Sequence, residues 1–245
     1  MIEFLGGTAT MAGRAVVAIF TPPWDFRALA YQIEALGLKS VGIASVTALA
    51  VGMVMGVQFA FGLMRFGSVM YVGKVVSIAI VRELGPVLTA LMVGGRIGSG
   101  MAAELGSMRV TEQLDAIRSM GADPIRKLVA PRVLATLIIL PLLTILADVL
   151  AVLGSMFIIC LEHSDVTPAF YINSVFETIR MSDVISGTGK TFFFAMFIAI
   201  IGCYQGFSAE GGTEGVGNAT TRTVVVTSTS ILVSDFFLTK LFMAF

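Results

Sequence analysis

Charged side chains concentrate in one stretch of this sequence, residues 81–131, which lies between two long apolar runs. The stretch begins as an apolar, helix-like segment that carries Arg82, Glu83 and Arg96. The charged residues that follow within a short distance are Arg109, Glu112, Asp115, Arg118, Asp123, Arg126 and Lys127. A charged hairpin between two apolar helices is a surface that a soluble protein can bind, so most of the functional prediction depends on it.

Glu83 is expected to lie about nine residues into an apolar helix that begins near Lys74. A carboxylate at that depth costs about 2.5 to 3.5 kcal/mol on insertion scales. Glu83 can be a structural clamp that pairs with Arg82, Arg96 or a residue of another helix, or it can face a water-accessible cavity. Neighbouring helical residues point in different directions, so Arg82 and Glu83 do not face each other, which favours the cavity.

Other stretches with potentially reactive residues do not match known catalytic or metal-binding motifs. Residues 186–191 read Ser-Gly-Thr-Gly-Lys-Thr, but a phosphate-binding loop needs a glycine where Val184 stands and a buried strand before it. His163, Cys160 and Cys203 do not have the spacing of metal ligands, so no metal site is predicted. Without a nucleophile–base pair, a membrane-embedded enzyme is disfavoured.

The composition indicates an integral membrane protein. Of 245 residues, 56% are hydrophobic and 13% are charged, with a mean hydropathy of +0.93, whereas soluble proteins carry about 25% charged residues. We therefore expect an all-α membrane protein in which residues 1–245 form a single transmembrane domain. The formal net charge is zero, so no nucleic-acid partner is implied.

Five stretches meet the roughly 20 residues needed to cross the hydrocarbon. The predicted spans are residues 41–64, 74–103, 134–161, 188–207 and 223–244. Residues 162–186 and 208–222 are expected to be polar loops. Pro86 is expected to kink the second span, because proline removes a backbone hydrogen bond.

Residues 1–39 are expected to form interfacial helices that precede the first span. Segment 4–20 is too short and too polar for a span, and residues 24–38 separate apolar from polar side chains on different faces. Trp24 and Tyr31 are typical of the headgroup level. The alternative for 24–38 is an ordinary amphipathic helix packed against protein.

Small residues recur every four positions along the first two predicted spans, which keeps them on one helix face. Such stripes predict tight packing against helices of the same or another protomer, because small side chains let two backbones approach closely. The candidate helix-packing residues are Gly52, Gly56, Gly94 and Gly98.

The hairpin is expected to contain a short surface helix over residues 111–120. Thr111 can cap its start and Gly121 can end it, and Asp123 with Pro124 can begin the next helix. Its apolar residues recur every three positions, which suits insertion into a groove of another protein; the alternative is a solvated loop helix. The candidate coupling residues are Glu112, Leu114, Asp115, Ile117, Arg118 and Gly121.

Loop charge predicts the orientation. Residues 104–132 contain five Lys or Arg, whereas residues 162–186 contain only Arg180. By the positive-inside rule the first loop is cytoplasmic and the second is outside. Five spans then place the N-terminus in the cytoplasm and the C-terminus in the periplasm.

The hairpin and several other motifs of the sequence resemble those of known protein families. The heptad Asp115–Gly121 is similar to the EAA-x-x-x-G coupling loop of ABC importer permeases, with Asp for Glu and Ile for the second Ala. A longer set of motifs resembles the MlaE family of permeases over roughly residues 40–245. These motifs are Arg82-Glu83-Leu84-Gly85-Pro86, Gly95-Arg96-Ile97-Gly98-Ser99, Ala103-Glu104-Leu105-Gly106, Met108–Leu114, Asp123-Pro124, Ala130-Pro131-Arg132 and Ala219–Val225.

The resemblance implies a homodimeric permease in the bacterial inner membrane that moves phospholipids between inner and outer membranes and so maintains outer-membrane asymmetry. It implies a cytoplasmic ABC ATPase that binds ATP and Mg²⁺, so this chain needs no cofactor. It also implies a STAS-domain protein and a periplasmic hexamer of MCE-domain proteins as partners.

On this interpretation the lipid path lies at the dimer axis and is lined by the first two spans. The candidate lipid-binding residues are Met55, Phe59, Leu63, Phe66 and Glu83. Each apolar one can equally face bulk lipid or another helix. The rival function is a secondary transporter or channel without an ATPase partner, which would use Glu83, Asp148 or Asp235 as ion sites.

Overall fold

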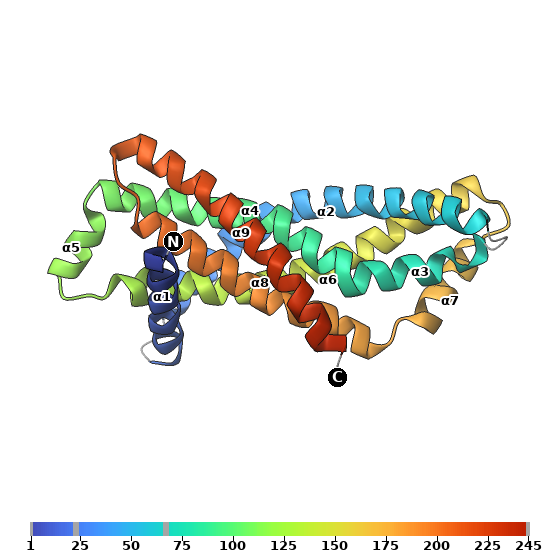
Figure 1. Cartoon of the computed structure of the whole chain (residues 1–245), viewed down its shortest axis with the longest axis horizontal. Helices are drawn as coiled ribbons and strands as arrows, with labels where there is room; N and C mark the ends of the chain where they lie inside the picture. Colours follow the sequence, from blue (N-terminus) through green and yellow to red (C-terminus); the bar gives the residue numbers. More distant parts are fainter. Residues whose placement is uncertain (1, 22–24, 66–68, 244–245) are drawn as a thin grey trace.

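The structure is a computed structural model that describes residues 2–21, 25–65 and 69–243. Within these residues every regular element is helical, and the helices form one elongated bundle (Figure 1). The chain begins with α1 (Ile2–Phe20) and α2 (Phe26–Met64). The elements that follow are the 3-10 turn η1 (Val69–Tyr71), α3 (Val72–Ala79), the π-helical segment η2 (Ile80–Leu84), α4 (Gly85–Val110), α5 (Gln113–Ser119), the π-helical segment η3 (Ile125–Val129), α6 (Ala130–Glu162), α7 (Pro168–Thr178), α8 (Met181–Phe207) and α9 (Gly212–Met243).

Five helical stretches of the described residues are long and apolar enough to cross a membrane, which confirms the predicted number of spans. They are α2, the run from η1 to α4, the run from η3 to α6, α8 and α9. Large apolar side chains such as Val46, Phe157 and Phe237 are exposed on them. A contiguous apolar exterior is what lipid hydrocarbon requires of a protein surface.

The first span extends further than predicted. Residues 26–38 do not form a separate interfacial helix, because they are the first turns of α2, which runs for 39 residues without a break. Nothing between residues 38 and 41 stops a helix, and the Ser40 hydroxyl donates back to the Leu36 carbonyl at 2.6 Å instead of competing with the helix. Trp24 and the adjacent prolines lie outside the described residues.

Helix α1 runs across the long axis of the bundle (Figure 1) and is not among the apolar stretches long enough to span. It packs on the core through Met11 and Ala15, which are 8% and 0% exposed. Arg14 forms an exposed ion pair with Asp123 of the hairpin at 3.3 Å. Residues 4–20 are therefore one helix held against the hairpin end of the bundle.

Both predicted polar loops are shorter than expected. The first contains α7 and the start of α8, and the second is reduced to residues 208–211 because α9 begins at Gly212. Threonines near the start of α9 donate to carbonyls one turn earlier, such as Thr220 to Gly217 at 2.6 Å and Thr223 to Ala219 at 2.8 Å. These bonds satisfy hydroxyls whose presence had suggested a loop.

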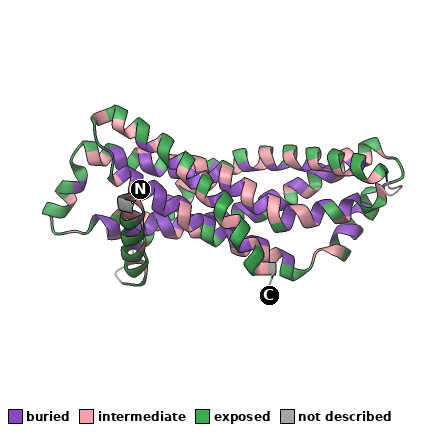
Figure 2. Ribbon diagram, viewed as in Figure 1, coloured by how far each residue is buried: buried purple, intermediate pink, exposed green. Residues whose placement is uncertain are grey.

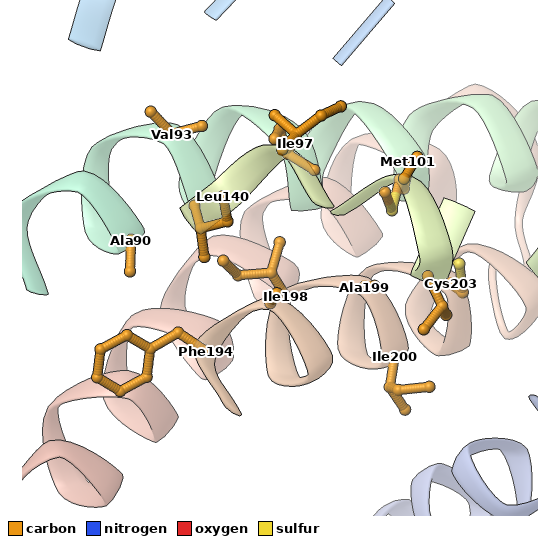
Figure 3. Close-up of a cluster of buried hydrophobic side chains, with 14 of the residues drawn as sticks. Ala90, Val93, Ile97, Met101, Leu140, Phe194, Ile198, Ala199, Ile200 and Cys203 are labelled. Carbon is orange, nitrogen blue, oxygen red and sulfur yellow. The ribbon is translucent and has the colours of Figure 1, made fainter. Parts of the chain in front are cut away.

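The bundle has two apolar cores along its length, and the buried residues form its interior (Figure 2). Figure 3 shows the larger core, where Ile97 and Met101 of α4 meet Leu140 of α6 and Ile198 and Cys203 of α8. The second core joins α2, α3, α6 and α7. The hairpin with α5 and the helix α7 lie at opposite ends of the long axis (Figure 1).

Helix α7 is fastened to α6 by one buried hydrogen bond. The Tyr171 hydroxyl donates to Ser155 Oγ at 2.9 Å, and Tyr171 is 1% exposed. Burial raises the pKa of Tyr171 above its ordinary value, because the phenolate would lose its hydration. The phenol therefore stays protonated and able to donate.

Candidate functional site

A cluster of charged side chains lies inside the spanning region, centred on Lys190 of α8. Lys190 Nζ is 2.6 Å from Glu83 Oε2 in η2 and 3.4 Å from Asp235 Oδ1 on α9. It also donates to Thr239 Oγ1 at 2.7 Å, and the Thr239 hydroxyl contacts the Glu83 carboxylate at 3.1 Å. The lysine side chain is 1% exposed, so it holds three parts of the bundle together where water does not reach it.

The backbone of the second span contributes to the same cluster. Pro86 has no N–H, so the carbonyl of Arg82 one turn earlier lacks its usual helical donor. Lys190 Nζ donates to this carbonyl oxygen at 3.2 Å. The helix is π-helical in the segment η2, which ends immediately before Gly85, and the kink expected at Pro86 stays a prediction.

Arg82 contacts a different part of α8 from Glu83. Its Nε and Nη2 are 2.8 and 2.6 Å from Asp183 Oδ1 at the start of α8. Asp183 Oδ2 also accepts from the Arg180 backbone N–H at 2.9 Å, which caps that helix. Adjacent residues of one π-turn thus anchor two separate points of α8.

The structure gives Glu83 the partner on another helix that a clamp requires, whereas the sequence had favoured a cavity. Arg96, another partner considered for Glu83, donates instead to Ser40 Oγ at 2.8 Å. The sequence interpretation missed Lys190 because residues 186–191 stood at an expected span boundary. A signal was available, since carboxylates within apolar runs require a cation. A direct contact between Glu83 and lipid stays a prediction.

Asp148 on α6 does not join this cluster. It is 8% exposed, and its Oδ1 has no hydrogen-bond partner among the described residues. It lies against Gly85, where a Cβ atom would overlap this oxygen. Asp148 also lines an apolar cavity of about 330 Å³ between α6 and α7, together with Phe176 and Val184.

A second apolar cavity, of about 210 Å³, lies between α2, the second span and α6. Small side chains such as Ala44, Ala48 and Ala147 form much of its wall. Met55, Phe59 and Leu63 do not line it, because they are partly buried against the core of α2, α3, α6 and α7. Their contact with acyl chains stays a prediction, and Phe66 lies outside the described residues.

Capping hydrogen bonds end α5 and start the next helix of the hairpin. Gly121 ends α5 with a φ of +76°, as its sequence position predicted. The Gly121 N–H donates to the Arg118 carbonyl at 2.9 Å and the Ala122 N–H to the Ile117 carbonyl at 3.2 Å, which is a Schellman motif. Asp123 Oδ1 then accepts from the Ile125 N–H at 3.0 Å and caps the next helix.

The start of α5 differs from the prediction. The helix has seven residues rather than about ten, and Thr111 ends α4 instead of capping α5. The chain turns at Glu112, which has a left-handed φ of 59°. Asp115 then holds the corner, since it accepts from Arg109 and Arg118 at 2.9 Å each.

The apolar side chains of the hairpin divide into two groups. Leu114 is 0% exposed, so it packs inside this chain and is not free to enter a groove of a partner. Ile117 is half-buried, and Met120 is 76% exposed. Met120, which directly follows α5, is therefore an exposed apolar side chain of the hairpin, while the coupling role of the six candidate residues stays a prediction.

The four candidate packing glycines all lie against helices of the same chain. A Cβ at Gly52 would overlap the Ala151 backbone of α6, and one at Gly56 would be 2.8 Å from Ser155 Oγ. A Cβ atom at Gly94 would be 2.6 Å from Ile198 of α8, and one at Gly98 would be 3.1 Å from Thr223 of α9 and 3.7 Å from Ile198. These contacts explain why α2 packs closely on α6 and why α4 packs closely on α8.

The fold and the intramembrane ion cluster define a multi-pass α-helical membrane protein with an extramembrane hairpin. Within the described residues, no group of three or more His, Cys, Asp or Glu side chains could hold a metal ion. The ionic residues instead join helices to each other.

Comparison with known proteins gives the family. Residues 29–241 match the family described as Permease MlaE, and the chain belongs to this family of ABC transporter permeases. A probable ABC transporter permease protein of Rickettsia conorii is 38% identical over 240 residues, which cover 98% of this chain and 92% of that protein. A protein of the same description from Synechocystis is 42% identical over 210 residues, covering 86% and 80% of the two chains.

A plant protein is also similar. The chloroplast protein trigalactosyldiacylglycerol 1 of Arabidopsis thaliana is 36% identical over 236 residues, which cover 95% of this chain and 66% of the plant protein. The motifs that resembled the MlaE family therefore identified it correctly. As an ABC transporter permease, the chain implies a separate ATPase partner.

Proposed function

We propose that this chain is the membrane subunit of an ABC transporter that moves phospholipids between the inner and outer membranes of a bacterium and so maintains outer-membrane asymmetry. The observation that carries the proposal is the family match over residues 29–241, which covers most of every one of the five spans. The Arabidopsis relative, whose name is that of a glycerolipid, supports a lipid as the transported molecule.

The geometry suits a lipid better than a hydrophilic solute. The cavity of about 210 Å³ between α2 and the second span has an almost entirely apolar wall, formed by residues such as Ala44, Val51 and Leu88. Burying acyl CH₂ groups there is favourable by about 0.8 kcal/mol each. Glu83 of the ion cluster directly precedes Leu84 and Gly85, which line this cavity. The cluster holds the second span to α8 and α9.

The ion cluster bears on two of the three ion sites of the rival function. A secondary transporter would use free carboxylates to bind a cation, but Glu83 and Asp235 both face the Lys190 ammonium. A cation that approached them would meet a like charge. Asp148, the third candidate, has no hydrogen-bond partner for its Oδ1 among the described residues, so the choice of an ATPase, which binds ATP and Mg²⁺, rests on membership of the permease family.

The proposed assembly is a homodimer of this chain in the inner membrane, with the ATPase and a STAS-domain protein on the cytoplasmic side. A periplasmic hexamer of MCE-domain proteins receives or delivers the phospholipid. The five Lys and Arg residues between positions 104 and 132 support a cytoplasmic hairpin, with the N-terminus cytoplasmic and the C-terminus periplasmic.

The test is reconstitution. The chain is expressed with its ABC ATPase partner and purified through a tag on the permease, and the complex is placed in vesicles that carry a fluorescent phospholipid. We expect ATP-dependent transfer of that lipid to MCE-protein acceptors. Transfer by the permease alone, driven by an ion gradient and independent of ATP, would instead establish the secondary transporter.

A further inference from the structure

A polar cleft of about 570 Å³ lies between α2, α4 and α9, away from the Lys190 cluster. Two cations, Lys39 of α2 and Arg96 of α4, are in its wall, together with the polar side chains of Tyr31 and Gln32. Thr220 lines it from α9. The cleft is thus built from three helices and combines two positive charges with neutral hydrogen-bonding groups.

The positive charge of this cleft is not neutralised. Within the described residues, Lys39 makes no ion pair and no hydrogen bond, and Arg96 donates only to the neutral Ser40 hydroxyl. The single carboxylate in the wall, Glu104, is 2.8 Å from the guanidinium of the buried Arg132. The cleft therefore attracts an anion that can accept hydrogen bonds.

The charge pattern of α2 indicates where the cleft lies relative to the membrane. Residues 41–64 carry no charged side chain, whereas Lys39 and Arg65 stand at their two ends. At 1.5 Å per residue this charge-free stretch is roughly 36 Å long, close to the hydrocarbon thickness of a bilayer. Lys39 therefore lies at the membrane boundary on the hairpin side, where phospholipid phosphates are found.

We propose that the cleft between α2, α4 and α9 binds the phosphodiester group of a phospholipid in the leaflet nearest the hairpin, with Lys39 and Arg96 as its ligands. The inference deepens the proposed function, on which it rests for the choice of a phospholipid as ligand. Arg96 is positioned by Ser40, so its guanidinium is held in place before the lipid arrives.

The test is calorimetric titration of the full chain in detergent with dihexanoyl phosphatidylglycerol, dihexanoylglycerol and inorganic phosphate. We expect the phospholipid to bind, and Lys39→Gln and Arg96→Gln each to weaken it about tenfold, because each removes one charge-assisted hydrogen bond. Arg65→Gln is the matched control, since it removes a cation from the opposite end of the same stretch. Lys39 is exposed, so its substitution leaves the fold intact.

Three results would overturn the inference. Equal affinity for dihexanoylglycerol would show that no phosphate is recognised, and equal affinity for inorganic phosphate would assign the cleft to a free anion. Unchanged phospholipid binding in both Lys39→Gln and Arg96→Gln would exclude the cleft. If ATP-dependent lipid transfer is nevertheless observed in reconstituted vesicles, the proposed function stands and only this site is wrong.

Discussion

Lys190 is the single side chain on which most of the intramembrane electrostatics depends. It offsets two carboxylates and satisfies a backbone carbonyl that Pro86 leaves without a donor. A charge buried without a partner is far more costly than a buried pair. Removing the cation therefore has a larger effect than removing either carboxylate.

We expect Lys190→Met to lower the stability of the permease by roughly 3 kcal/mol or more, because Glu83 and Asp235 lose the ammonium group that faces both of them. Glu83→Gln should cost less, since Lys190 keeps Asp235 and the amide can still bond to Thr239. Thermal unfolding of the full chain in detergent measures which of the two variants is less stable.

The matched control is Lys240→Met, which removes an exposed lysine of α9 that lies over the Phe236 ring at 5.0 Å. Its melting temperature should stay close to that of the unmodified chain. A Lys190→Met variant as stable as the Lys240→Met variant would show that the ion cluster does not hold the helices together.

At the scale of the element, the contact of α2 with α6 is set by glycine. Gly52→Ala would place a Cβ atom on the Ala151 backbone, which cannot move as a flexible side chain can. We expect a loss of about 1 to 3 kcal/mol from this overpacking. Circular dichroism during heating in detergent measures the change.

Gly62→Ala on the same helix is the control, because nothing lies within 4 Å of a Cβ there. It should be neutral or stabilising by up to about 1 kcal/mol, since alanine favours the helix. Equal melting temperatures for the two variants would mean that α2 can move away from α6 without cost.

The hairpin helix α5 gives a second prediction at this scale. Met120→Asp should leave the isolated permease as stable as before, because Met120 is 76% exposed, but should lower lipid-stimulated ATP hydrolysis by the complex. The physical reason is that a charge replaces the apolar side chain offered to the ATPase groove. Hydrolysis by the purified complex is the measurement.

Leu114→Asp is the contrasting variant. Because Leu114 is 0% exposed within the chain, its substitution should destabilise the permease even without a partner. If Met120→Asp leaves hydrolysis unchanged while the complex assembles normally, α5 does not transmit nucleotide-driven motion.

Local rules predicted parts of these elements well and other parts poorly. Gly121 and Asp123 could be identified as helix-ending and helix-starting residues because capping depends on a few neighbouring atoms. The continuity of α2 and the early start of α9 could not, because packing against α6 and α4 overrides the weak preferences of glycine and threonine. The role of Lys190 could not be predicted from its neighbours in the sequence, because its partners lie on two other helical stretches.

At the scale of the whole molecule, the low charge of the sequence predicted a membrane protein, and the lengths of its apolar stretches predicted the five spans. The orientation of the bundle stays a prediction. Figure 1 places the α5 hairpin and α7 at opposite ends of the long axis, so the two ends should be accessible from opposite sides of the membrane.

Cysteine accessibility tests that orientation. In a chain without Cys160 and Cys203, a single cysteine at Phe176 should react with a membrane-impermeant thiol reagent in intact spheroplasts, whereas one at Met120 should not. These positions are 79% and 76% exposed, so exposure does not bias the comparison. Labelling at Met120 alone would invert the proposed topology.

The length of α2 has a mechanical consequence. The 14 residues from Phe26 to Lys39 extend about 21 Å beyond the charge-free stretch, and α4 continues past Arg96 for a similar distance. With the bilayer boundary as a pivot, a tilt of only about 10° moves the far end of such a helix by roughly 4 Å. The extramembrane part of the bundle is therefore a lever arm, through which a rocking of the spans and a displacement of a few Å at the hairpin are the same motion.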